Sequence, residues 1–144
     1  MPANLKYADL KIGAEYGPFS WKAESKKVDK FLEAVDDDYP AYHNAEDAKK
    51  LGYDKKIAPP TLAAVYFLDA YDKAFPTRPP GGIHVKQIFN FYEPPCPDDT
   101  LITNLKIADK YTKRDRFYIK VESITKKENG SLVSEGVMTV IWAK

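Results

Sequence analysis

The chain has 144 residues, 44% of them hydrophobic and 30% charged, so it is long enough to bury a core and too apolar to be disordered. Its 22 basic and 21 acidic residues give a formal net charge of +1, and so small a charge creates no long-range field that would attract nucleic acid or an anionic membrane. Cys96 is the single cysteine, which excludes an intramolecular disulfide and, with two histidines (His43 and His84), falls short of a zinc ligand set.

No targeting or spanning segment is predicted. The first residues contain no apolar run of the kind found in signal peptides, and nowhere do 18 apolar residues follow one another. We find no repeat, low-complexity tract or linker, so we expect one domain over residues 1–144. The composition is typical of a soluble, cytoplasmic protein.

Two amphipathic helices are predicted near the N-terminus. The first covers residues 26–36, with Ser25 as its N-cap. Its apolar residues recur at the spacing of one helix face: Val28, Phe31, Leu32 and Val35. The second is short, residues 45–51, with Asn44 as its cap and Gly52 after its end.

A third predicted helix is different in character. Thr61 is its expected N-cap, and residues 62–68 are apolar on every side of the helix. A helix without a polar face in its first two turns is expected to be surrounded by protein. Pro76 marks its end.

The second half of the chain shows the two-residue alternation of strands. Four strands are predicted, the first three from residues that share one strand face: Val85, Gln87, Phe89 and Phe91; Leu101, Thr103, Leu105 and Ile107; Phe117, Ile119 and Val121; and residues 132–142. The second and third strands meet near residues 113–115, and residues 126–130 join the third to the fourth through the hairpin dipeptide Asn129-Gly130, with positive φ expected at both of its positions. The last three strands are therefore expected to be consecutive and antiparallel.

An all-apolar helix and an antiparallel sheet have few ways to pack. If the sheet curls around the helix, most of the helix circumference is buried. We therefore predict the α+β class with a hotdog fold, an antiparallel sheet wrapped around a central helix. A ferredoxin-like sandwich is the alternative, but it expects strands that alternate with amphipathic helices, and this order is absent here.

Two segments carry a resemblance to a known family. Residues 31–43, FLEAVDDDYPAYH, and residues 50–61, KLGYDKKIAPPT, resemble the N-terminal, FAS1-like dehydratase domain of the MaoC-like dehydratase family. Shorter matches extend the resemblance over nearly the whole chain: Ile12-Gly13, Pro18-Phe19, Val28 and residues 97–101. The resemblance implies a hotdog domain that adds water to enoyl thioesters or removes it from 3-hydroxyacyl thioesters, without metal or cofactor.

The family motif reads Asp, two residues, Pro, one residue, His, and its Asp and His hold the catalytic water. By position, Asp37 matches the aspartate and Pro40 the proline, but Tyr42 stands at the histidine position and His43 follows it. Active members also place His-Gly at the start of the central helix, where a backbone N–H polarises the thioester carbonyl. Here those positions are Pro59 and Pro60, and proline has no N–H.

The resemblance makes Asp37, His43 and Tyr42 the candidate catalytic residues. Each also has a structural interpretation: Asp37 belongs to an acidic turn, His43 precedes a helix cap, and packing is the simpler role for Tyr42, because a phenol with a pKa near 10 holds its proton at neutral pH. Candidate substrate-binding residues are Pro60 and Thr61 at the start of the central helix, Arg78 in the loop after it, and Arg114 for carrier phosphates.

Three functions remain open from the sequence. The first is an enoyl-CoA hydratase or 3-hydroxyacyl dehydratase with Asp37 and His43 as the acid–base pair. The second is a non-catalytic partner subunit that shapes the acyl tunnel of a heteromeric dehydratase. The third is a hotdog thioesterase, for which Asp69 or Asp72 would supply the carboxylate. In each case the expected ligand is an acyl-CoA or acyl carrier thioester. A second hotdog chain is also expected, in a homodimer or a heterodimer, because an open sheet edge favours pairing.

Overall fold

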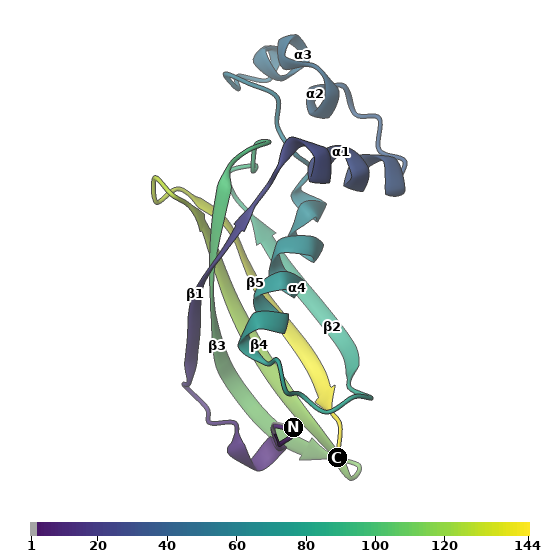
Figure 1. Ribbon diagram of the computed structural model, residues 1–144, viewed down its shortest axis with the longest axis vertical. Coiled ribbons are helices and arrows are strands. Elements are labelled where there is room, and N and C mark those ends of the chain that lie inside the picture. The colour runs from purple at the N-terminus through teal and green to yellow at the C-terminus, as the bar shows by residue number, and fades with distance from the viewer. Residues whose placement is uncertain (1–2) are drawn as a thin grey trace.

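The computed structural model describes residues 3–144. Within them an antiparallel five-stranded sheet has the order β1-β3-β4-β5-β2, so β1 and β2 are its edge strands (Figure 1). The strands are β1 (Glu15–Lys22), β2 (Ile83–Phe91), β3 (Thr100–Lys113), β4 (Arg116–Lys127) and β5 (Leu132–Trp142). The last three strands are consecutive and antiparallel, as predicted.

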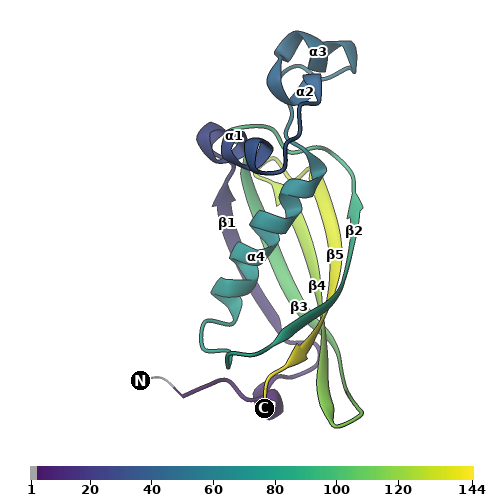
Figure 2. The same cartoon turned by 90° about the vertical axis from the view of Figure 1, so that its right-hand side faces the viewer.

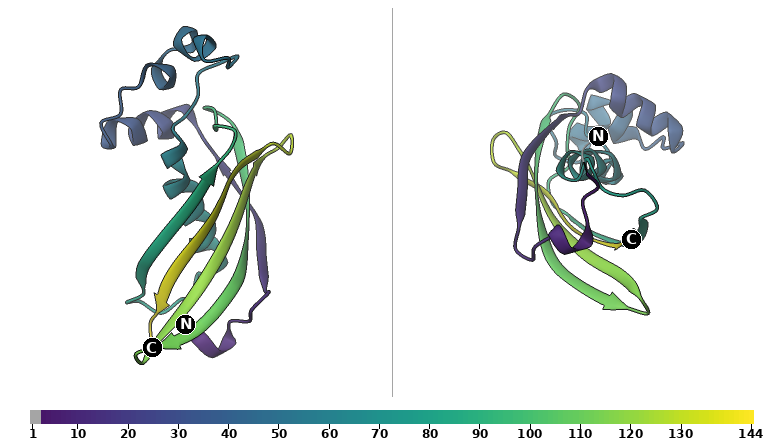
Figure 3. Two further views of the ribbon diagram at one scale, coloured as in Figure 1. Left: turned by 180° about the vertical axis from the view of Figure 1, so that it is seen from behind. Right: turned by 60° about the horizontal axis from the view of Figure 1, so that its bottom comes forward.

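The sheet curves around one long helix, α4 (Ala63–Ala74), which lies along its concave face (Figures 2 and 3). Three shorter helices gather beyond one end of the sheet: α1 (Ser25–Ala34), α2 (Pro40–His43) and α3 (Ala45–Lys50). Single 3-10 turns lie at Tyr7–Asp9 (η1) and at Pro60–Leu62 (η2), and η2 leads into α4. The arrangement is the predicted hotdog fold, and none of the helices in residues 3–144 is long and apolar enough to cross a membrane.

The core between helix and sheet follows the strand alternation that was read from the sequence. On β3 the predicted inward set is buried: Leu101, Thr103, Leu105 and Ile107. Ile119 and Val121 of β4 are buried beside them. The side chains between these positions face the other side of the sheet, so the two-residue period alone determines which face meets α4.

Helix α4 is not enclosed on all sides, and in this respect the sequence prediction was wrong. One face is buried against the sheet: Ala63, Tyr66, Phe67, Ala70 and Tyr71. Ala64 is exposed, and Leu68 retains 43% of its exposure. A sheet of this curvature covers only part of the helix circumference, so an apolar strip of α4 stays open in the single chain.

Two predicted helix caps, at Ser25 and Thr61, were also wrong. Ser25 lies inside α1, after Glu24 in the cap position, and its Oγ is 3.0 Å from Asp98 Oδ2. Thr61 lies within η2, so Leu62 precedes the first residue of α4. The cap at Asn44 is confirmed, since its side chain accepts a hydrogen bond of 2.8 Å from the Glu46 N–H.

The two hairpin turns lie where the sequence predicted, but their backbone conformations differ from expectation. Between β4 and β5, Gly130 has positive φ (87°) and Asn129 does not, and the Lys127 N–H donates to the Ser131 carbonyl (2.9 Å). Between β3 and β4 it is Arg114 and Asp115 that both have positive φ, 50° and 60°. This is the left-handed pair that a tight two-residue hairpin requires, here without glycine.

Candidate functional site

The short helices form a cap over the N-terminal end of α4 (Figures 1 and 2). Backbone hydrogen bonds fix the loop after α3 in place, because Ile57 N–H donates to the Ala41 carbonyl (3.2 Å) and Ala58 N–H to the Pro95 carbonyl (2.7 Å). Pro40 starts α2, where its missing N–H costs nothing. The segment with the motif residues is therefore tied both to α4 and to the loop that follows β2.

Tyr42 lines an aromatic cavity of about 140 Å3 where this cap meets α4. Pro60 and Tyr66 border the same cavity from the start of the helix, and Tyr53 and Tyr92 from the surrounding loops. At its inner wall the Tyr66 hydroxyl and Ser134 Oγ are 2.7 Å apart and share a buried hydrogen bond. The residue at the position of the motif histidine thus borders a partly open cavity with a mostly apolar lining.

Two hydroxyls of this cavity, those of Tyr42 and Tyr66, keep their protons at neutral pH. Burial raises the pKa of Tyr42, and the neighbouring charge of Asp37 raises it further. Burial also raises the pKa of Tyr66, to about 12, although the hydrogen bond to Ser134 opposes the shift. At neutral pH both groups are neutral hydroxyls that can donate or accept a hydrogen bond, and neither can act as a base.

His43 faces a different space. Its Nε2 is 2.8 Å from the backbone carbonyl of Asp37, and the two residues border an acidic hollow of about 330 Å3. The carboxylate of Asp37 accepts a hydrogen bond of 3.1 Å from the Tyr39 N–H, so it stabilises its own turn. Consecutive residues of a helix point about 100° apart, which is why a displacement of one position separates Tyr42 from His43.

The start of α4 offers few backbone donors. Pro59 and Pro60 have none, and the Leu62 N–H donates to the Pro59 carbonyl at 3.0 Å. Thr61 is exposed at this end of the helix. Pro60 borders the same cavity as Tyr42, where it contributes only its apolar ring.

The two candidate arginines lie away from the cap. Arg78 follows α4 at its C-terminal end, pairs with Asp72 and donates from Nη1 to the Phe75 carbonyl at 3.1 Å. Arg114 is in the β3–β4 turn, at the end of the sheet opposite the cap (Figure 1). Because β3 has 14 residues, a length of about 45 Å at 3.3 Å per residue, one chain does not bring Arg114 to Asp37 or Tyr42.

The carboxylates considered for a thioesterase are both engaged in ion pairs. Asp69 Oδ2 is 2.6 Å from Lys73 Nζ, one turn further along α4, and Asp72 pairs with Arg78. Tyr66 was missed by sequence reasoning, which placed it among apolar helix residues. Its hydroxyl was the available signal, because a buried tyrosine hydroxyl needs a partner and therefore marks a polar point in the core.

Comparison with known proteins places the chain in a family. The family model "FAS1-like, dehydratase domain region" matches residues 11–136. A UPF0336 protein of Saccharopolyspora erythraea is 28% identical over 137 residues, covering 90% of this chain and 87% of its own.

Solved structures show the same fold. The R-hydratase PhaJ1 of Pseudomonas aeruginosa has a TM-score of 0.82 at 20% identity, covering 98% of this chain and 87% of its own. A chain of the HadBC (3R-hydroxyacyl-ACP dehydratase) complex of Mycobacterium tuberculosis has a TM-score of 0.80 at 24% identity, covering 90% of this chain and 96% of its own. The family-model match shows that the chain belongs to the FAS1-like dehydratase domain family, and the solved structures share its hotdog fold.

Proposed function

We propose that this chain is the subunit of an acyl-thioester hydratase or dehydratase that shapes the acyl site, while a second hotdog chain supplies the catalytic histidine. One observation carries the proposal: the neutral hydroxyl of Tyr42 occupies the cavity at the motif position, and His43 is directed to the backbone carbonyl of Asp37 outside it. The substrate is an acyl group on coenzyme A or on an acyl carrier protein.

The chemistry of hydration supports a catalytic histidine from the second chain rather than from this one. Adding water to a conjugated thioester requires a base that takes a proton near neutral pH and a donor that polarises the carbonyl. Tyr42 cannot be that base, since burial holds its pKa above its usual value. The two prolines at positions 59 and 60 remove backbone donors that could polarise the carbonyl.

The exposed edge of the sheet supports a partner chain. β2 pairs only with β5 and carries large apolar side chains in the open: Ile83 (50% exposed), Val85 (49%), Ile88 (44%) and Phe91 (44%). Leu68 on the open strip of α4 adds to this surface. Such an edge is an aggregation hazard unless another strand covers it. A second β2 laid antiparallel along this edge would cover both the strand and the strip of α4, and HadBC is itself a complex of two chains.

The test compares the chain alone with its complex. A tagged chain is recovered from its source cells, and co-purifying proteins are searched for a hotdog chain with the complete Asp-x-x-Pro-x-His motif. We expect the purified chain alone to leave crotonyl-CoA and longer enoyl-CoAs unchanged, and the complex to consume them, followed by the absorbance of the conjugated thioester. In the complex, His43→Gln is expected to leave turnover unchanged, and Tyr42→Ala to alter the preference for acyl length.

An active homodimer is the second candidate, because Asp37 and His43 border the same hollow and touch through the Asp37 backbone. The homodimer alternative predicts that the chain alone hydrates enoyl-CoAs, and that Asp37→Asn and His43→Gln each lower the hydration rate by two orders of magnitude or more. Observation of that pattern would refute the partner-subunit proposal. Tyr39→Phe, which keeps the Tyr39 N–H bond to Asp37 and removes only the hydroxyl of an exposed side chain, is the matched control.

Association itself is tested at the edge strand. Val85→Glu places a charge on the exposed side of β2 and is expected to convert the assembly to single chains in light scattering. Ile12→Glu, a substitution at an apolar residue before β1 that is 61% exposed, is the control and should leave assembly intact. An assembly unaffected by Val85→Glu would contradict pairing through β2.

A further inference from the structure

The hydroxyl pair at the inner wall of the aromatic cavity has one proton more than its shared bond uses. Tyr66 and Ser134 are each 1% exposed, and their oxygens share a hydrogen bond of 2.7 Å. Each hydroxyl has one proton to donate and two lone pairs that accept. Whichever oxygen donates in the shared bond, the other keeps its proton, and within residues 3–144 neither side chain forms a further hydrogen bond. The pair therefore has an unused donor, and a buried donor without an acceptor is unfavourable.

Tyr66 is the member of the pair that can offer this donor to a ligand. It borders the cavity from α4, whereas Ser134 on β5 does not line it. If Ser134 donates to Tyr66, the Tyr66 proton is free for the cavity. Burial raises the pKa of Tyr66 to about 12, so that proton is present at neutral pH. The Tyr92 hydroxyl, in contrast, already donates to Glu135 Oε2 at 3.0 Å.

The size and lining of the cavity favour a flat, ring-sized group. Its volume is about 140 Å3, and an engineered protein cavity of about 150 Å3 binds benzene. Much of its border consists of aromatic side chains: Tyr42, Tyr53, Tyr66, Phe91 and Tyr92. Contacts between aromatic rings stabilise beyond the burial of their area. A ring therefore fits both the volume and the lining of this cavity.

The charges around the cavity disfavour an anion. Glu93 borders it, and its carboxylate is 3.8 Å from Lys127 Nζ. The carboxylate of Asp37 is close enough to raise the pKa of Tyr42. Among the residues that line the cavity there is no lysine or arginine. A negatively charged ligand would meet these carboxylates without a cation beside it, so the acceptor that suits Tyr66 is a neutral one.

We propose that the aromatic cavity binds a flat, neutral, ring-sized group that carries a hydrogen-bond acceptor, and that the Tyr66 hydroxyl donates to this acceptor. Ser134 positions the Tyr66 proton by donating to the Tyr66 oxygen from behind. The identification of the ring as part of an acyl substrate rests on the proposed function. The binding of the ring does not.

The experiment measures binding without turnover. The probes are pyridine and benzene, which have the same shape, and at pH 8 pyridine is neutral and carries an acceptor that benzene lacks. The backbone amide signals of Ile57, Tyr66 and Val133 in proton–nitrogen NMR spectra report occupancy and its location. We expect both probes to shift these signals and benzoate to leave them unchanged. The same spectra show whether each variant is folded.

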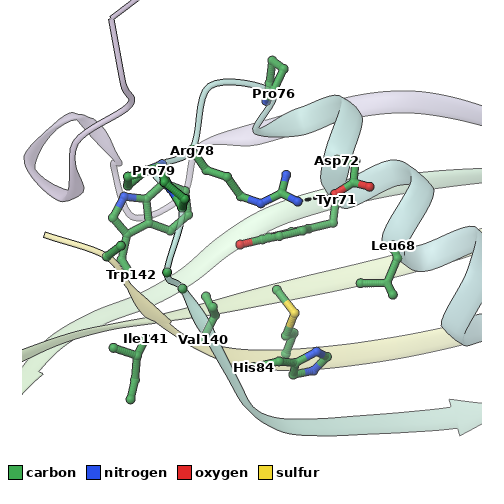
Figure 4. A pocket seen from close by; sticks show the side chains of 15 residues that line it. Leu68, Tyr71, Asp72, Pro76, Arg78, Pro79, His84, Val140, Ile141 and Trp142 are labelled. Atoms are coloured by element: carbon green, nitrogen blue, oxygen red, sulfur yellow. Dashed lines mark hydrogen bonds and ion pairs between the residues drawn. The ribbon is translucent and has the colours of Figure 1, made fainter.

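Tyr66→Phe should weaken the binding of pyridine about fivefold, the effect of one hydrogen bond between neutral groups, and leave that of benzene unchanged. Tyr71→Phe is the matched control, because it removes a hydroxyl from the same helix at a separate cavity of about 530 Å3 near the C-terminal end of α4 (Figure 4). It should change neither affinity. Ser134→Ala should retain pyridine binding, because the Tyr66 proton remains.

Three results would overturn the proposal. They are no amide shift with either aromatic probe, an unchanged affinity for pyridine in Tyr66→Phe, and binding of benzoate as tight as that of pyridine. None of these measurements depends on hydratase activity, so failure of the proposed function is detected separately.

Discussion

The hydrogen bond between Tyr66 and Ser134 joins α4 to β5 beneath the aromatic cavity, and its removal is the sharpest test of how that cavity is held. Both side chains are 1% exposed, and their hydroxyl oxygens are 2.7 Å apart. Tyr66→Phe leaves the Ser134 hydroxyl buried without a partner, which costs about 2 kcal/mol of unfolding free energy. With an unfolding entropy of about 0.3 kcal/mol/K for a chain of this length, the midpoint of thermal unfolding falls by about 6 °C.

The assay is urea unfolding of Tyr66→Phe, Ser134→Ala and the double variant, at one protein concentration because association also contributes to stability. Ser134→Ala is expected to cost less than Tyr66→Phe, since the Tyr66 hydroxyl borders the cavity and can be reached by water. The double variant should lose less unfolding free energy than the two single variants lose together, and the difference, the coupling energy, should be about 1 kcal/mol. Single losses below about 0.5 kcal/mol that add without coupling would refute this reasoning.

Two further predictions concern the same layer of the molecule. Gly136→Ala should destabilise the chain by about 1–3 kcal/mol, since an added Cβ would lie 2.7 Å from Ser123 Oγ and 2.9 Å from Phe89 Cδ1, and thermal unfolding measures the loss. Unchanged stability would mean that the Phe89 ring moves freely on the edge strand. Stability should also fall between pH 10 and pH 12, because Tyr66 and Tyr71 have pKa values of about 12 when folded and 10 when unfolded, so only the folded chain keeps these protons in that range. The loss of unfolding free energy approaches about 3 kcal/mol per tyrosine at pH 12 and is absent below pH 10. Urea unfolding at pH 9 and pH 11 measures this loss. If Tyr66→Phe lost as much stability between these pH values as the wild-type chain, Tyr66 would be excluded as a cause.

Much of the fold could be predicted from local patterns. The alternation at Leu101, Thr103 and Leu105 predicted which side chains of β3 are buried, because a strand has only two faces. Asn44 was predicted as a cap from its place before an acidic first turn, and it forms that hydrogen bond. These features depend on residues a few positions apart, so no knowledge of the rest of the chain was needed.

Other local signals failed where a distant residue competes for the same side chain. Ser25 is a good cap by its chemistry, yet its hydroxyl meets Asp98, which lies 73 positions away in the sequence. Of the Asn129-Gly130 dipeptide only Gly130 has positive φ, whereas Arg114 and Asp115 both have it in the other hairpin turn. Turn geometry depends on the strand register across the sheet as well as on the dipeptide, and the sequence pattern contains only the dipeptide.

The candidate site shows the same division. The residues of the motif region, Asp37, Tyr42 and His43, were all identified from the sequence, together with the substitution of tyrosine at the histidine position. Their directions were not, because the orientation of a four-residue helix is set by the hydrogen bonds that tie Ala41 and Ala58 to other segments. Only that orientation assigns Tyr42 to the aromatic cavity and His43 to the acidic hollow.

The sequence by itself determined the curled sheet, the apolar helix inside it and the family, since each depends on periodic burial or on short motifs. The tertiary structure alone decided that one strip of α4 and the edge of β2 stay open, and that Tyr71 and Trp142 line the same cavity (Figure 4). The physical reason is that exposure depends on which surfaces meet. In this chain those surfaces come from α4, β2 and β5, and β5 lies tens of residues beyond the other two in the sequence.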